Sequence, residues 1–267
     1  MTGRATPHTD ALVARLHEFG ESSAVALLLT SGRGAVRVLA KGAKRLRNSF
    51  AGPLDKGALY RVRLGRRSGE GLVLLHASTL REPFPRLRRD PGRFAAATFV
   101  LEVAAHLLRE NEPQPELFRL TVFCLKVVER APARRLALAL AFFLTRAVAL
   151  SGHAPRLDGC AACGRPVSGR ERALLSPARG GLLHASCARG EPGSRPLSPA
   201  GRRLLARLEA APPGEALGMG APAAAGRELV ALLTGWLEYL LECRIRSTRG
   251  LARALRAAGV SPPHRRG

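Results

Sequence analysis

The sequence predicts an α+β protein, in which an N-terminal five-stranded barrel precedes a mostly α-helical part that carries a cysteine-rich insertion. Three observations support this prediction. Residues 11–80 contain short alternating apolar runs separated by glycine-rich turns, which is typical of β-strands. Beyond residue 85 the apolar residues recur with a helical period. Between the helical stretches lies a glycine- and proline-rich segment with two closely spaced pairs of metal-ligating side chains.

The N-terminal strands can be assigned in order. Residues 1–10 are polar and are expected to form a disordered leader, and the barrel is expected over residues 11–81. The sequences Ser31-Gly-Arg-Gly34 and Arg66-Arg-Ser-Gly-Glu-Gly71 are hairpin signals. The OB-fold is a five-stranded barrel that commonly binds oligonucleotides, so it is the predicted fold. The expected strands cover residues 11–17, 23–30, 35–40, 59–64 and 72–80.

Glu82-Pro-Phe-Pro85 interrupts the strand pattern and marks the boundary of the barrel. The helical domain is expected over residues 86–155 and again over 196–258, separated by the cysteine-rich segment at 156–190 and followed by a tail at 259–267. Ser198 before Pro199 is a typical helix N-cap. The expected helices cover residues 94–109, 116–130, 134–151 and 199–210, then a linker at 212–224 and one long closing helical region at 227–258.

The chain carries 43 Lys and Arg against 20 Asp and Glu, a formal net charge of +23. Such a charge opposes compaction and calls for a polyanionic partner, with nucleic acid first and an anionic membrane surface second. The coding bias of a GC-rich genome can explain why arginine is more frequent than lysine, but it does not explain why basic residues outnumber acidic ones. The longest apolar run, Leu136 to Leu150, is interrupted by Arg146, and the first ten residues contain no apolar signal core. A cytoplasmic protein is therefore expected.

Basic residues gather in one loop, one strand and one hairpin of the predicted barrel. Neutralising phosphates with such residues releases counterions and gives salt-sensitive, largely sequence-independent affinity. The alternative is that these basic residues form a charged surface that is only solvated and binds no nucleic acid. Aromatic residues are sparse, so phosphate contact is favoured over base stacking. The candidate DNA-binding residues are Arg37, Lys41, Lys44, Arg45, Arg47, Arg61, Arg63, Arg66 and Arg67.

The cysteine-rich segment contains Cys160-Ala-Ala-Cys163 and His184-Ala-Ser-Cys187, separated by twenty residues. Two such pairs can close a four-coordinate zinc site with no open position. The candidate ligands are therefore Cys160, Cys163, His184 and Cys187, holding one structural Zn²⁺ ion. Inert cysteines in a degenerate site, or a redox pair at Cys160 and Cys163, are the alternatives. Cys124 and Cys243 are expected to be structural.

The sequence contains no phosphate-binding loop, dinucleotide fingerprint, nucleophile elbow or paired acids in a plausible pocket segment. His17, His106 and His153 stand alone and are more typical of structural than of catalytic histidines. The chain is therefore predicted not to be an enzyme.

A series of short motifs follows in order along most of the chain. The motifs are Phe19-Gly-Glu21, Leu28-Leu-Thr30, the loop Ala40 to Arg45 with Ser49, Phe99-Val-Leu-Glu102, Glu116-Leu-Phe118, Ser151 to Pro155, Leu157 to Cys163 and Ser176 to Gly181. In this order and spacing they resemble the bacterial RecO family of recombination mediators and DNA repair proteins. The resemblance implies an OB-fold, a mostly helical remainder and a zinc motif of two Cys-x2-Cys pairs, with His184 at the usual place of the third cysteine.

The resemblance also implies function and partners. RecO-like proteins bind single- and double-stranded DNA, anneal complementary strands, and act with RecR and single-stranded DNA-binding protein to load RecA on coated strands. The resemblance further implies that this protein is bacterial, is associated with the nucleoid and has no membrane partner. We expect the acidic tail of single-stranded DNA-binding protein to enter an apolar, basic-rimmed groove of the helical part, with Arg119, Lys126 and Arg130 as candidate contacts. A metal-stapled RNA-binding OB-fold protein is the alternative, and a thiol redox enzyme is a third possibility.

Overall fold

The computed structural model describes residues 8–42, 53–67, 71–168 and 171–257. The chain divides into two compact units. The first contains the barrel, up to Asp90, and residues 100–129; the second contains residues 91–99 and the chain from Arg130 onward. Each unit contains both helices and strands, so the predicted α+β class is confirmed.

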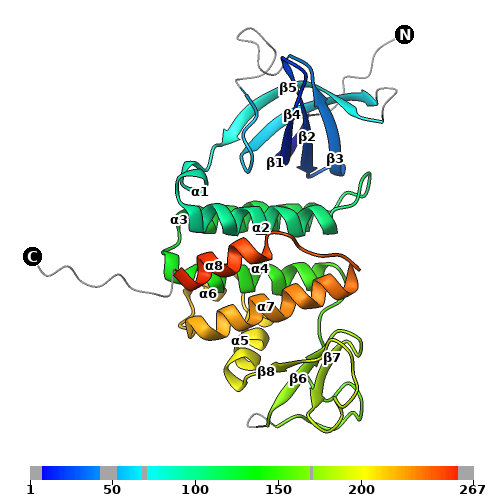
Figure 1. The fold of residues 1–267 in the computed structure, drawn as a ribbon, viewed down its shortest axis with the longest axis vertical. Helices are drawn as coiled ribbons and strands as arrows, with labels where there is room; N and C mark the ends of the chain where they lie inside the picture. Colours follow the sequence, from blue (N-terminus) through cyan, green and yellow to red (C-terminus); the bar gives the residue numbers. More distant parts are fainter. Residues whose placement is uncertain (1–7, 43–52, 68–70, 169–170, 258–267) are drawn as a thin grey trace, which may run out of the picture. The chain divides into compact units, whose positions relative to one another are not determined.

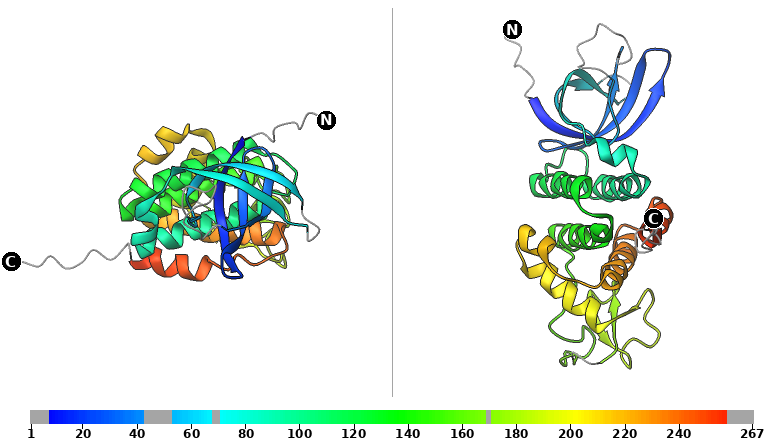
Figure 2. Two further views of the ribbon diagram at one scale, coloured as in Figure 1. Left: turned by 90° about the horizontal axis from the view of Figure 1, so that it is seen from above. Right: turned by 90° about the vertical axis from the view of Figure 1, so that its left-hand side faces the viewer.

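Five strands close into a barrel in the order β1-β2-β3-β5-β4, and β4 also pairs with β1 (Figures 1 and 2). All neighbouring strands are antiparallel except β3 and β5, which are parallel. The predicted five-stranded barrel is thereby confirmed. The strands are β1 (His8–Phe19), β2 (Ser23–Thr30), β3 (Gly34–Ala40), β4 (Leu59–Arg67) and β5 (Val73–Glu82).

The first strand is longer than the sequence pattern indicates. It begins at His8, within the stretch expected to be a leader, because His8 pairs with Arg63 of β4. It runs on to Phe19, which pairs with Ser23, so the connection between the first two strands is shorter than the gap between the expected strands at 11–17 and 23–30. Long-range pairing thus extends both ends of β1 through residues that lack an apolar alternation.

Alternation along the strands separates the barrel core from its outer surface, as expected for successive residues of a strand. The interior is filled by small and branched apolar side chains, and the polar residues between them point outward. Buried core positions include Ala11, Val13, Leu28, Val36, Val38, Val62, Leu64, Val73 and Leu75. The outward set includes the exposed side chains of Arg37, Arg61 and Arg63.

The β2–β3 hairpin is fixed within the first unit by a close backbone approach. Gly34 has φ +66°, and a Cβ there would lie 1.9 Å from the carbonyl oxygen of Arg109. Ala35 N–H donates to that carbonyl at 3.3 Å, and Asn111 N–H donates to Arg33 O at 3.0 Å. Only glycine fits this position, because it tolerates positive φ and presents no side chain to the facing backbone.

Three helices follow the barrel: α1 (Pro85–Arg89), α2 (Pro91–Leu107) and α3 (Pro115–Arg130). The carboxylate of Glu129, on α3, accepts hydrogen bonds from the backbone N–H groups of Arg86 at 3.0 Å and Leu87 at 2.9 Å. An acidic group at a helix N-terminus satisfies donors that have no partner inside the helix. This contact secures α1 to α3 within the first unit.

In the second unit, α4 (Leu136–Leu150) is buried along almost its whole length, as predicted for a central helix. It packs against α7 (Ala223–Leu240) and α5 (Pro199–Ala210). A Cβ at Gly226 of α7 would lie 3.3 Å from the backbone of Ala137, so this glycine permits close helix packing. Ser198 accepts a hydrogen bond from Gly201 N–H at 2.9 Å, which confirms the predicted N-cap of α5.

Two predictions for the C-terminal part are wrong. The expected linker at residues 212–224 contains a short helix, α6 (Pro213–Gly218), which begins with a proline that the first helical turn tolerates. The expected single helical region at 227–258 is two helices, α7 and α8 (Thr248–Ala257). Glu242, with φ +49°, follows α7, and buried Ile245 then donates its backbone N–H to Glu238 at 2.9 Å.

The cysteine-rich segment is more regular than its glycine and proline content predicts. It contains two strands, which form a three-stranded sheet with a third strand that follows the segment, in the order β7-β6-β8, drawn in yellow-green in Figure 1. The strands are β6 (Ala173–Ser176), β7 (Gly181–His184) and β8 (Arg195–Leu197). Leu175, Leu182 and Leu183 are buried, so these short strands do have a small core.

No helix in the described part of the chain combines the length and the apolar character that a membrane-spanning segment requires.

Candidate metal centre and nucleic-acid surface

Two tight turns present the four predicted ligands. In the first turn, Gly164 N–H donates to Cys160 O at 2.8 Å, and Gly164 takes φ +74°. In the second, the N–H groups of Cys187 and Ala188 donate to His184 O at 3.0 and 3.1 Å. Each turn therefore directs both members of its pair to one side.

The small sheet brings the two turns together. Ala161 N–H donates to Leu182 O of β7 at 2.7 Å, which places the first turn beside the end of the strand that carries His184. Arg156 N–H donates to Gly180 O at 2.9 Å, and Leu182 N–H donates to Arg156 O at 3.0 Å. The chain before the first turn is thus hydrogen-bonded to β7.

The ligand atoms of Cys160, Cys163, His184 and Cys187 all lie within 4.8 Å of one another. His184 Nδ1 lies 3.5 Å from Cys163 Sγ and 4.0 Å from Cys187 Sγ. With zinc bonds of about 2.3 Å to sulfur and about 2.0 Å to nitrogen, tetrahedral ligand atoms are roughly 3.5–3.8 Å apart. The four side chains therefore fit a tetrahedral metal ion, and the cluster is a candidate metal site with all its positions filled by protein.

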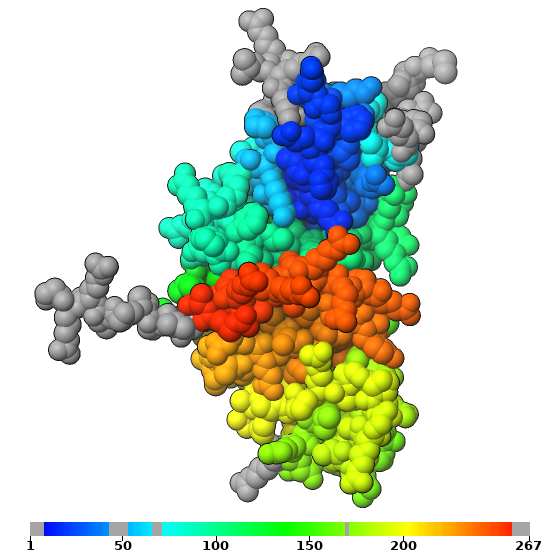
Figure 3. Space-filling model, in the orientation of Figure 1, coloured from blue at the N-terminus to red at the C-terminus, as the bar shows by residue number. Residues whose placement is uncertain are grey.

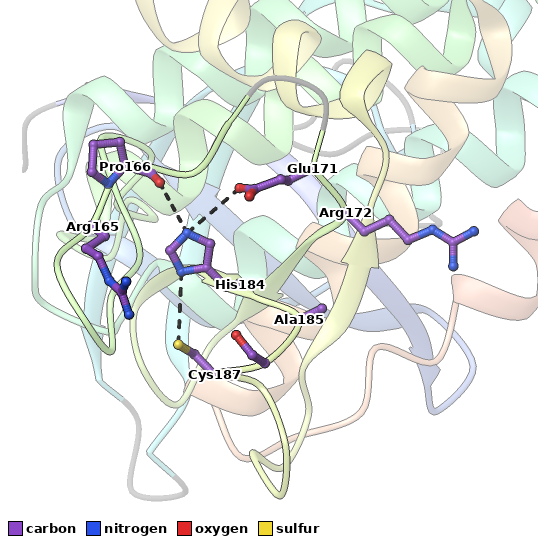
Figure 4. A pocket seen from close by; sticks show the side chains of 8 residues that line it. Arg165, Pro166, Glu171, Arg172, His184, Ala185 and Cys187 are labelled. Atoms are coloured by element: carbon purple, nitrogen blue, oxygen red, sulfur yellow. Dashed lines mark hydrogen bonds and ion pairs between the residues drawn. The ribbon is translucent and has the colours of Figure 1, made fainter.

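A second contact sets the tautomer of the histidine. His184 Nε2 lies 3.1 Å from the carbonyl oxygen of Pro166, to which a protonated Nε2 donates, leaving the lone pair of Nδ1 directed at the sulfurs (Figure 4). The Pro166 carbonyl also raises the pKa of His184. A metal-ligating histidine commonly donates its other ring nitrogen to a carbonyl in this way. The surroundings of His184 thus match its expected role.

The thiols of the cluster differ in their ease of ionisation. Burial opposes ionisation of Cys160, but hydrogen bonds from backbone N–H groups outweigh it and lower the pKa of its thiol to about 6. A hydrogen bond from the Arg165 backbone lowers the pKa of Cys163. Burial and the neighbouring Cys160 raise the pKa of Cys187. A divalent cation would neutralise the negative charge that several thiolates at one point would otherwise accumulate.

The candidate metal site lies next to the protein surface. Cys160 is buried, whereas Cys163 is exposed. A cavity of about 490 Å³ adjoins the cluster, and Figure 4 shows the side chains around it. It is lined by Arg165, Pro166, Glu171, Arg172, His184, Ala185, Ser186 and Cys187. A small chelator can therefore approach the cluster without unfolding of the helical part.

On the barrel, Arg61 and Arg63 both point outward from β4, but their neighbours differ. Arg61 Nη1 donates to Asp10 Oδ1 at 3.2 Å. Arg63 is flanked across the strands by His8 and Ala77, and no described residue forms an ion pair with it. Arg63 is therefore the more available of the two for contact with a phosphate.

A second outward row of the barrel includes an arginine that sequence reasoning missed. Arg37 on β3 is in register with Leu27 of β2, and Leu27 is in register with Arg15 of β1. Arg15 and Arg37 are both exposed. Two strand spacings put their backbones about 10 Å apart. The alternation of β1 contained the signal for Arg15, but only the register between strands shows that it lies in line with Arg37.

The remaining predicted cations of the barrel are placed only in part. Lys41 is exposed directly after β3. Lys44, Arg45 and Arg47 lie outside the described residues. The backbones of Arg66 and Arg67 end β4. Arg15 and Arg37 therefore form one row on β1 and β3, whereas Arg61 and Arg63 lie on β4, which pairs with residues 8–12 of β1 and not with the part that carries Arg15.

Comparison with known proteins identifies the family. Residues 4–84 match the family model for the N-terminal part of recombination protein O, and residues 88–249 match the model for its C-terminal part. The chain belongs to the RecO family. The resemblance seen in the sequence motifs is thereby confirmed.

Relatives named DNA repair protein RecO match nearly the whole chain. The protein of Anaeromyxobacter dehalogenans strain 2CP-C is 37% identical over 240 residues, which are 90% of this chain and 93% of the relative. That of Desulforudis audaxviator is 33% identical over 254 residues, 95% of this chain and 97% of the relative. The RecO family consists of recombination mediators rather than enzymes, so the prediction of a non-enzymatic protein is confirmed.

The other cysteines of this RecO-family chain are not members of the candidate metal site. Cys124 is fully buried on α3, and burial raises the pKa of its thiol strongly. Cys243 follows α7 and is half-buried. Among the described residues, neither belongs to the group that could hold a metal ion.

Proposed function

We propose that this chain is a recombination mediator that binds single- and double-stranded DNA, anneals complementary strands, and helps to load RecA onto strands coated with single-stranded DNA-binding protein. The observation that carries the proposal is family membership over both parts of the chain. The net charge of +23 and the outward arginines of the barrel support it. RecR and single-stranded DNA-binding protein are the proposed protein partners, and the bacterial cytoplasm, at the nucleoid, is the proposed location.

The barrel, residues 11–81, is the proposed DNA-binding domain. Arg15 and Arg37 form one row of positive charge, and Arg63 lies on another strand. Guanidinium groups neutralise phosphates whatever the base sequence, so the contact suits an annealing protein that must accept any strand. Screening two polyanions held near each other lowers their repulsion, which speeds pairing without breaking or forming a covalent bond.

The candidate metal site is proposed to hold one structural zinc ion. Three thiolates and one imidazole are a typical zinc donor set, and zinc supplies about 10–16 kcal/mol of apparent binding free energy in small zinc-dependent folds. The ion would join the two turns of residues 156–190 across β7. His184 would serve as the ligand in place of the family's usual third cysteine.

A site for the acidic tail of single-stranded DNA-binding protein is proposed on the helical part. Lys126 is paired with Glu82 at 2.9 Å, and Arg119 lies 3.9 Å from Glu116, so two of the three predicted contacts, all but Arg130, already have acidic neighbours. A cavity of about 680 Å³ in the second unit has an arginine and a methionine, Arg207 and Met219, in its lining. Loss of tail-peptide binding in an Arg207→Ala variant would support this cavity over Arg119 and Lys126.

Two assays with the full chain test the proposed function. The first mixes complementary labelled oligonucleotides and records the rate of duplex formation; we expect the protein to accelerate it at low salt. The second lets single-stranded DNA and RNA of equal length and sequence compete for the protein. Preference for RNA without acceleration of annealing would refute the proposal and support an RNA-binding OB-fold protein instead.

A further inference from the structure

The last described helix, α8, has a strongly two-sided distribution of side chains. Leu251 and Leu255 are buried, whereas Arg249, Arg253 and Arg256 are exposed. At 100° per residue, the three arginines fall within about 60° of one another, on the side opposite the two leucines. Figure 3 shows α8, in red, uncovered on the face in view.

The position of α8 is fixed by the segment before it. Ile245 is buried, and its backbone N–H donates to the carboxylate of Glu238 at 2.9 Å. Thr248 Oγ1 donates to Ile245 O at 2.7 Å, and Leu251 N–H donates to Ser247 O at 3.0 Å. Arg249, Arg253 and Arg256, called the arginine stripe below, therefore lie on a helix whose start is anchored by hydrogen bonds.

Helix stability does not account for the arginines. Arg249 lies in the first turn, where the helix dipole disfavours a positive charge by about 0.3–1 kcal/mol. Gly250 beside it costs about another 0.5–1 kcal/mol in a helix, although a side chain would meet nothing within 4 Å. Arg256, in the last turn, is favoured by the helix dipole, so only Arg249 is held at a cost to the helix. Within α8 and among the described ion pairs, the three positive charges have no acidic partner.

Resting on the proposed DNA-binding function, we propose that Arg249, Arg253 and Arg256 form a second nucleic-acid contact surface, separate from the barrel, that grips the phosphate backbone. The stripe is about 10 Å long at 1.5 Å per residue, and a DNA strand carries one phosphate about every 3.4 Å, so three phosphates match it. One chain then holds two nucleic-acid segments, one on each unit.

The chemistry of the stripe favours nucleic acid over an acidic peptide. Gly250, Ala252 and Ala257 lie beside the exposed arginines, and because these residues are small they leave room for a nucleic-acid backbone to approach. The leucines of α8 face inward, so within the described helix they offer the stripe no apolar contact of the kind that fixes a peptide side chain. Repeated charge without such a pocket suits a regular polyanion.

The test uses the full chain with Arg249→Ala, Arg253→Ala and Arg256→Ala combined. The matched control combines Arg134→Ala, Arg189→Ala and Arg203→Ala, which removes the same charge from exposed positions on different elements of the same unit. Alanine is the best helix former, so α8 should remain folded, and circular dichroism checks this. The probe is a single-stranded oligonucleotide of about 15 nucleotides, a length within the range that one OB-fold covers.

At low salt, native mass spectrometry should show two oligonucleotides on the wild-type and control chains and one on the α8 variant. On longer single strands, the slope of log affinity against log salt should fall by about 2, at roughly 0.7 per phosphate lost. Equal stoichiometry and slope in the α8 and control variants would overturn this inference and leave the proposed function intact. A wild-type chain that binds no oligonucleotide would overturn both. Displacement of DNA from the wild type but not from the α8 variant by a poly-glutamate peptide, at equal charge concentration, would instead assign α8 to a peptide.

Discussion

The ion pair between Arg61 and Asp10 makes a prediction about which charges of the barrel meet DNA. The Arg61 guanidinium donates to Asp10 at 3.2 Å, and both side chains are about half exposed, at 48% and 40%. Arg63, two residues further along β4, faces no acid across the strands. If phosphate contact occurs on this face, Asp10→Asn should strengthen DNA binding and Arg63→Ala should weaken it.

The magnitudes follow from the exposure of the pair. An exposed ion pair contributes about 0.2–1 kcal/mol, so breaking it has a small effect on stability. The freed guanidinium gains one phosphate contact of about 0.5–1 kcal/mol, which is about a two- to fivefold gain in affinity. The salt slope should steepen by about 0.7 for single strands. Arg63→Ala should lose affinity and slope by similar amounts.

Fluorescence anisotropy with a labelled single strand, titrated at several salt concentrations, measures both quantities. Asp158→Asn is the matched control, because it removes one negative charge from an exposed acid paired with Arg156 at 3.6 Å in the other unit. The effect of Asp10→Asn should also disappear in an Arg61→Ala background. If Asp10→Asn and Asp158→Asn have equal effects, only net charge matters and the assignment of this face is refuted.

Three further predictions concern the second unit and the cysteines. Removing the metal with a chelator should speed hydrogen exchange at the backbone amides of Ala161 and Leu182 while leaving α4 protected; unchanged exchange would show that the turns need no metal. Cys124 should resist alkylation until the protein unfolds, because burial raises the pKa of its thiol; modification in the native state would contradict this. Burial also raises the pKa of Glu209, and its Oε1 has no hydrogen-bond partner among the described residues. The folded state therefore binds its proton more tightly than the unfolded state does, and stability is lost as pH rises above the carboxyl's ordinary value. Glu209→Gln should raise Tm at pH 7 but not near pH 3; a lower Tm at pH 7 would refute this reading.

Local patterns in the sequence were sufficient to predict the barrel and the four clustered side chains. Strict alternation marks the core-facing residues of the strands, and paired ligands need only a tight turn each. For His184, the spacing from Cys187 and from Cys163 is enough to predict its place in the cluster, which the structure confirms.

The features that could not be predicted from the sequence depend mainly on contacts between residues that are distant in the chain. The ends of β1 are extended by pairing with Arg63 and Ser23, and Arg15 is aligned with Arg37 only through the register of β2. The strands of the small sheet are three or four residues long, too short for a periodic signal. The break between α7 and α8 rests on the contact of Glu238 with Ile245, which no local rule marks.

The most direct test of the account is annealing of complementary strands that are first coated with single-stranded DNA-binding protein. The full chain should accelerate duplex formation on the coated strands, and the rate should fall when Arg15, Arg37 and Arg63 are replaced together by alanine. Binding of naked DNA without any acceleration on coated strands would contradict the proposal that this RecO-family chain is a recombination mediator.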